Sequence, residues 1–91
     1  MTDPLAPLRE RFRTRLRDEL KQLRALRGST EASGDLRLLA HSLAGAAGTF
    51  GYPALSTVAI TVDDRYVSGE TPTAEELDAL DAAIVAVIET A

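Results

Sequence analysis

Residues 40–51 read AHSLAGAAGTFG and contain the only histidine of this 91-residue chain, His41. In a helix successive residues turn by about 100°, so the apolar residues of this region share one side. They are Leu36, Leu39, Ala40, Leu43, Ala47 and Phe50. His41 points roughly the other way, and Gly45 and Gly48 follow it one and two turns on. The pattern predicts an amphipathic helix that presents an imidazole to solvent, as suits a nucleophile offered to another protein.

The same segment resembles the signature of histidine-containing phosphotransfer (HPt) domains. The matching positions are Ala40, His41, Leu43, Gly45, Ala46, Ala47, Phe50 and Gly51. The segment departs from the signature at Ala44, where the family has a lysine. The resemblance implies a stand-alone protein that carries a phosphoryl group on His41 between a hybrid histidine kinase and response-regulator receiver domains. It also implies that the protein has no ATP-dependent kinase activity of its own.

Two other interpretations of this segment stay open. His41 is also what a solvated histidine on an ordinary helix would look like. The missing lysine at Ala44 leaves room for a degenerate HPt-like adaptor or inhibitor, which docks receivers or kinases without efficient transfer. A phosphotransfer assay separates the adaptor from the relay.

Apolar residues at three- and four-residue steps predict three further helices. One is expected over about 4–27 with Asp3 as its cap, and another over about 53–67. The last one begins at Thr73, which forms a capping box with Glu76, or at Thr71. The helix of His41 itself is expected from Ser33 or an earlier cap to about residue 50. Because no segment alternates like a strand, we expect one all-α domain over residues 1–91, an antiparallel up-down-up-down four-helix bundle.

The apolar stripes of the flanking helices define the expected core. In the first helix the stripe is Leu5, Leu8, Phe12, Leu16, Leu20 and Leu23. In the third it is Leu55, Val58, Ala59, Val62 and Tyr66, and in the last Leu77, Leu80, Ile84, Val87 and Ile88. Ile60 and Val67 fall off the third stripe. They either widen the core face or contact a partner.

Composition and charge exclude several classes of function. The chain has no cysteine, hence no disulfide or thiolate chemistry, and no apolar run near the ~20 residues of a membrane span. We therefore expect a cytoplasmic protein that does not enter a membrane. Eight of the ten cations lie in the first third of the chain, whereas the last third is acidic. The first helix could bind nucleic acid, but its basic face lacks stacking aromatics, so mutual neutralisation of the two helices is the better interpretation.

The HPt resemblance also suggests which residues surround His41. Aligning Gly51 and Leu55 with the family pattern places Asp63 where the family orients the imidazole, and Asp63 lies at the rim of its helix's apolar face. Arg37, one turn before His41, could replace the missing lysine in offsetting phosphoryl charge. Each of these two residues could equally be a plain surface residue.

The remaining predictions concern the surface that a partner would contact. The expected docking face consists of Leu38, Ala44, Gly45 and Gly48. Glycine costs helix stability, so two glycines on an exposed face indicate access to His41, unless a neighbouring helix needs the space. One histidine without a carboxylate cluster makes no metal site, so magnesium is expected only in the partner receiver. We expect a monomer without a cofactor.

Overall fold

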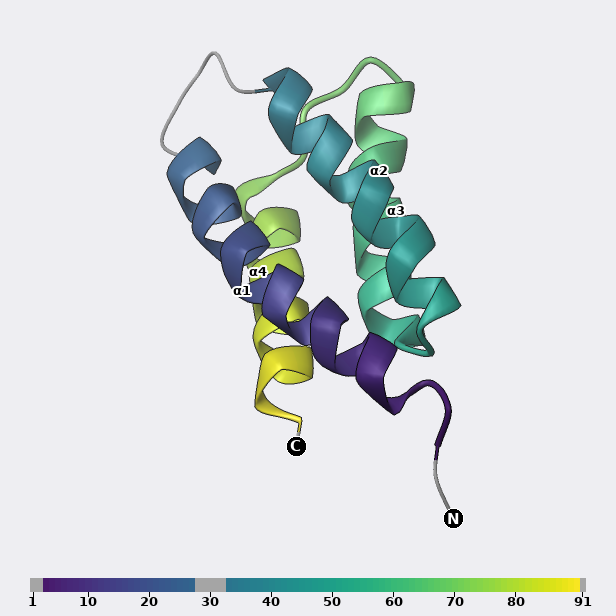
Figure 1. Cartoon of the computed structure of the whole chain (residues 1–91). Helices are drawn as coiled ribbons and strands as arrows, with labels where there is room; N and C mark the ends of the chain where they lie inside the picture. The colour runs from purple at the N-terminus through teal and green to yellow at the C-terminus, as the bar shows by residue number, and fades with distance from the viewer. Residues whose placement is uncertain (1–2, 28–32, 91) are drawn as a thin grey trace.

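The computed structural model describes residues 3–27 and 33–90, and for Ser33 only the backbone. These residues form four α-helices and no strand: α1 (Ala6–Arg27), α2 (Ser33–Thr49), α3 (Pro53–Val67) and α4 (Ala74–Glu89). Successive helices run in opposite directions, and each packs against two neighbours (Figure 1). Helix α2 lies between α1 and α3, and α4 closes the other side of the bundle. The predicted all-α four-helix bundle is confirmed for this part of the chain.

The helix ends follow the local signals in the sequence. Gly51 has a φ of +85°, and the amides of Tyr52 and Gly51 bond the carbonyls of Ala47 (2.8 Å) and Gly48 (3.3 Å). This is the Schellman arrangement that ends a helix at glycine. Thr73, not Thr71, caps α4. Its hydroxyl accepts from the amide of Glu76 at 3.1 Å, and the Glu76 carboxylate accepts from the amide of Thr73 at 2.9 Å.

The first helix begins two residues later than the sequence suggested. Residues 4 and 5 form a turn before α1, and the Asp3 carboxylate accepts from the amide of Leu5 at 2.9 Å. Gly28, the expected end of this helix, lies outside the described residues.

The core forms where the apolar stripes of the four helices pack against one another. Its buried members are Phe12, Leu16, Leu23, Leu36, Leu39, Ala40, Leu43, Ala47, Leu55, Ala59, Val62, Leu80, Ile84 and Val87. Phe12 also packs against Phe50 in a tilted pair and stacks against Tyr52, with ring centroids 5.1 and 5.8 Å apart. The stripe of α1 fails at Leu5 and Leu8, which are exposed. With 22 residues α1 is longer than its neighbours, so its first turns have less of the bundle to pack against.

Ion pairs join α4 to both of its neighbours. The Arg24 guanidinium bonds both carboxylate oxygens of Asp81, at 2.9 and 3.1 Å, and Arg27 pairs with Asp78 at 2.7 Å. These contacts confirm that the basic first helix and the acidic last helix neutralise each other along an exposed edge. The Arg24 hydrogen bond, the largest influence, also lowers the pKa of Asp81.

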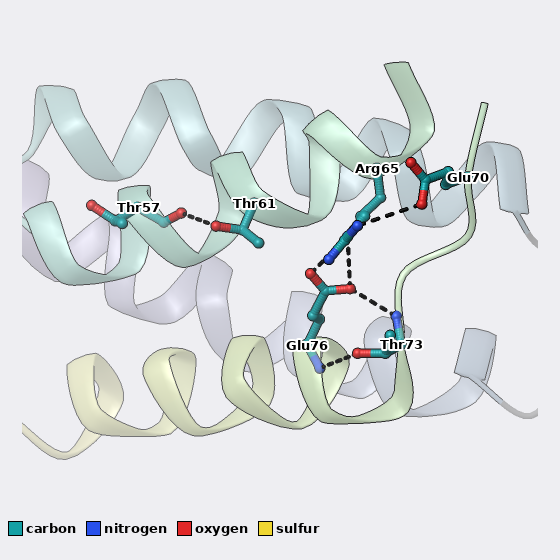
Figure 2. A network of polar contacts seen from close by, with 6 residues as sticks. All are labelled: Thr57, Thr61, Arg65, Glu70, Thr73 and Glu76. Carbon is teal, nitrogen blue, oxygen red and sulfur yellow. Dashed lines mark hydrogen bonds and ion pairs between the residues drawn. The ribbon is translucent and has the colours of Figure 1, made fainter. Parts of the chain in front are cut away.

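A second polar network fixes the connection between α3 and α4 (Figure 2). Arg65 of α3 donates to both oxygens of Glu76, at 2.9 and 3.1 Å, and pairs with Glu70 at 3.4 Å. Glu76 thus both caps α4 and joins α4 to α3 through Arg65. The hydrogen bond from the Thr73 amide, followed by that from Arg65, lowers the pKa of Glu76.

None of the helices in the described ranges is both long and apolar enough to cross a membrane.

Candidate functional site

His41 lies on the outer face of α2 and points toward α3. Its side chain is 76% exposed, whereas that of Asp63 on α3 is only 16% exposed. The Nδ1 atom of His41 is 3.1 Å from Oδ2 of Asp63. Two residues that are 22 positions apart in the chain therefore meet at the α2/α3 edge. An exposed ring is held here by a carboxylate that is itself largely covered.

This contact fixes which ring nitrogen is free. An ionised carboxylate only accepts hydrogen bonds, so Nδ1 of His41 carries the proton that bonds Asp63. In the neutral imidazole the second nitrogen, Nε2, then has the lone pair. Because the ring is exposed, that lone pair is available to an incoming reactant. The geometry provides a nucleophilic nitrogen with a defined tautomer.

The two glycines beside His41 differ in their surroundings. A Cβ built on Gly45 would meet no atom within 4 Å, so no packing contact requires glycine there. A Cβ on Gly48 would lie 3.4 Å from the hydroxyl oxygen of Ser56 on α3. Gly45 thus leaves open space beside the imidazole. Gly48 also faces α3, so the close approach of that helix is a second reason for a glycine at this position, besides access to His41.

Ala44 occupies the inner margin of the site. It is partly buried and packs against the core, and its carbonyl accepts a hydrogen bond from Ser56 at 2.8 Å. It contributes little to the exposed surface. Leu38 is 69% exposed and is the more prominent member of the expected docking face.

Arg37 and His41 line the same shallow groove, together with Gly34 and Leu38. Its volume is about 430 Å³. Arg37 makes no ion pair within the described residues, and no contact joins it to the imidazole. Arg37 is thus one turn from His41 in the lining of the same groove.

Helix α3 adds residues that the sequence left undecided. Ile60 and Val67 are both exposed. They stand three residues before and four after Asp63, and such residues are neighbours on a helix surface. Two apolar side chains therefore flank the carboxylate that contacts His41. The spacing of Ile60 and Val67 from Asp63 is the feature of the sequence from which their position beside the site could be predicted. No feature of the sequence indicates the hydrogen bond from the Ser56 hydroxyl to the Ala44 carbonyl.

Metal ligation is not apparent at this edge. No group of three or more His, Cys, Asp or Glu side chains in residues 3–27 and 33–90 is placed to hold an ion.

Comparison with models of known protein families gives a match. No curated protein and no solved structure matches the chain. The sequence model of the Hpt domain matches residues 7–90, which is nearly the whole chain. Hpt domains are helical bundles that act as phosphotransfer carriers rather than kinases, and they interact with receiver domains and histidine kinases of two-component systems. The bundle fold agrees with that match, and the chain belongs to the Hpt domain family.

Proposed function

We propose that this Hpt domain carries a phosphoryl group on Nε2 of His41, between a hybrid histidine kinase and the receiver domain of a response regulator. The observation that carries the proposal is the exposed imidazole whose Nδ1 contacts Asp63. Phosphoryl transfer asks the protein for position and charge compensation, and little else. The exposed imidazole supports the first requirement, and Arg37, which lines the same groove, is the candidate for the second.

In the accepting step, the Nε2 lone pair of His41 attacks the phosphorus of an aspartyl phosphate on the kinase's receiver. The N–P bond forms as the bond between phosphorus and the carboxylate oxygen breaks, and the aspartate leaves as a carboxylate. His41 keeps its proton on Nδ1, so the phosphorylated ring is cationic. Asp63, at 3.1 Å from Nδ1, offsets that charge and holds the ring. In the donating step the response regulator's aspartate attacks phosphorus, and the N–P electrons return to Nε2.

The surroundings of His41 suit a reaction inside a partner's pocket. A receiver's acidic, magnesium-binding site must close over the ring, and Gly45 leaves the space for it. We expect the magnesium ion to arrive with the receiver. Arg37, in the same groove, is the candidate cation for the phosphoryl oxygens. Leu38, Ile60 and Val67 are exposed apolar side chains around the site and would form the contact.

An adaptor that docks receivers without efficient transfer is the second candidate. Ala44 favours it, because the family's lysine is absent there. We prefer the active relay, since a docking module has no need of an imidazole with a fixed tautomer. We further propose that the protein acts as a stand-alone, cytoplasmic monomer without kinase activity of its own.

The test is phosphotransfer profiling of the protein against the receivers and kinases of its own cell. We expect at least one phosphorylated receiver to label the wild type and His41→Gln to abolish labelling, with unchanged circular dichroism because an exposed residue contributes little to packing. Unlabelled wild type that still binds receivers would favour the adaptor. Undiminished labelling of the His41→Gln variant would rule out His41 as the carrier.

A further inference from the structure

A second groove lies on the other side of α2, between α2 and the second half of α1. It measures about 490 Å³. Its apolar lining includes Leu26, Leu38 and Leu39, and its polar lining includes Glu19, Gln22 and Asp35. In the first half of α1, Phe12 contacts Phe50, the residue that follows α2, whereas the groove occupies the region toward the other end of α1.

The groove is continuous with the face that presents His41. Leu38 lines both this groove and the one that contains His41 and Arg37. The Leu38 side chain is largely exposed, so it separates the two hollows as a ridge on the surface. A protein that covers both His41 and Leu38 would therefore reach the border of the second groove.

The charge of the groove selects one kind of occupant. Among the described residues its lining contains two carboxylates, Glu19 and Asp35, and no cation, while Arg15 lies beside it and donates to Glu19 and to Ser42, both at 2.6 Å. Asp35 is exposed and has no ion pair in the described part of the chain. Glu19 is only 12% exposed. Its Oε1 accepts from Arg15 at 2.6 Å, while its Oε2 has no hydrogen-bond partner within the described residues. Because Arg15 already pairs with Glu19, Asp35 is the carboxylate that favours an incoming cation, and the leucines favour an apolar stem.

Building on the proposed function, we propose that this groove receives a lysine or arginine side chain of the receiver domain that docks on His41. The aliphatic stem lies on Leu26, Leu38 and Leu39, and the charged head pairs with Asp35 at the exposed rim. The groove would thereby select among receivers by the presence of a basic residue at the edge of their docking surface. Phosphoryl chemistry at His41 needs no such pair, so the groove would act on affinity and partner choice.

The first experiment measures affinity for a receiver that the wild type labels, using Asp35→Asn, Asp35→Lys and the control Asp18→Lys. Asp18 is exposed on α1 and lines neither groove, and its replacement by lysine changes the net charge as much as Asp35→Lys does. We expect Asp35→Asn to weaken binding several-fold, Asp35→Lys tenfold or more, and Asp18→Lys less than twofold. The difference should shrink at high salt. Equal effects of Asp35→Lys and Asp18→Lys would overturn the proposal.

The second experiment does not depend on transfer. N-acetyl-arginine amide is titrated into unphosphorylated protein that is isotope-labelled with nitrogen-15, and the amide chemical shifts are recorded. N-acetyl-norleucine amide serves as the uncharged control. We expect saturable shifts at Asp35, Leu38 and Leu39 with the arginine probe only, lost in Asp35→Asn. Equal shifts with both probes, no shifts in the groove, or dimerisation of the chain through this surface would overturn the proposal. If the probe binds but no receiver labels His41, the proposed function fails while the groove remains a site for basic side chains.

Discussion

The α2/α3 edge and the two edges of α4 use charged side chains differently. Along α4, Arg24, Arg27 and Arg65 each hold a carboxylate of that helix, so charge joins helix to helix. At the α2/α3 edge the polar side-chain pair is His41 with Asp63, and the ring remains exposed. One region uses ionic contacts to join helices, and the other leaves an imidazole exposed. Substitutions at the α2/α3 edge should therefore change transfer, whereas substitutions at the edges of α4 should change stability.

Asp63→Asn should give the largest separation. An asparagine can turn its amide toward Nδ1 and favour the other tautomer, which leaves the lone pair on the wrong nitrogen. Replacing the partner that orients a metal-bound histidine typically costs about 10- to 100-fold in activity, and we expect a similar cost for this metal-free histidine. We expect a loss of transfer in that range and a melting temperature within about 2 °C of the wild type. A large fall in melting temperature with normal transfer would make Asp63 a structural residue.

Gly45→Leu should impair docking next most strongly. The new side chain would stand in the open space beside His41. The substitution also replaces a glycine within a helix, and this replacement by itself stabilises the folded state by up to about 1 kcal/mol. We expect receiver affinity to fall about tenfold while the melting temperature stays equal or rises. The control is Ala82→Leu on the exposed face of α4, which should change neither quantity. Unchanged affinity together with easier unfolding of Gly45→Leu would show that the glycine serves packing.

Arg37 and Ala44 test how phosphoryl charge is offset. In an active relay whose cation has moved to Arg37, Arg37→Ala should slow transfer about two- to fivefold, and adding Ala44→Lys should restore it. The effect is modest and decreases with salt because both positions border solvent. In a docking adaptor the wild type transfers poorly, and Ala44→Lys alone raises the rate. An active protein that Arg37→Ala leaves unchanged, in both transfer rate and phosphohistidine lifetime, would remove Arg37 from the site.

Glu76→Gln alters the ion pair that joins α3 to α4, away from His41, and should have the smallest effect on transfer. Thr73 and Arg65 lower the pKa of Glu76 in the folded state. A carboxylate with a lowered folded pKa stabilises the fold above its unfolded pKa, and that stability is lost as the pH falls through the folded value. Wild-type melting temperature should therefore drop below about pH 4.5, the ordinary glutamate value, and Glu76→Gln should drop less. Transfer at pH 7 should be unchanged, and identical acid profiles would contradict this role.

Much of the fold could be predicted from the sequence because its signals are local. Gly51 and the Thr73–Glu76 pair mark helix ends through contacts within a few residues. The position of Asp63 beside His41 also follows from pattern, since helix periodicity and the HPt resemblance both limit where it can lie. The exposure of Leu8 and the groove beside Leu26 could not be predicted. The first depends on how far α1 extends past its neighbours and the second on how α1 and α2 pack together, and a single-helix pattern contains neither.

The central claim is that His41 carries the phosphoryl group on Nε2 while Asp63 holds Nδ1. The direct measurement is nitrogen and phosphorus NMR of the protein after treatment with phosphoramidate, a small donor that requires no partner. We predict one phosphohistidine, with a phosphorus coupling to Nε2 of His41 and a retained proton on Nδ1, and no signal in His41→Gln. A phosphoryl group on Nδ1, or on any other residue, would contradict the account.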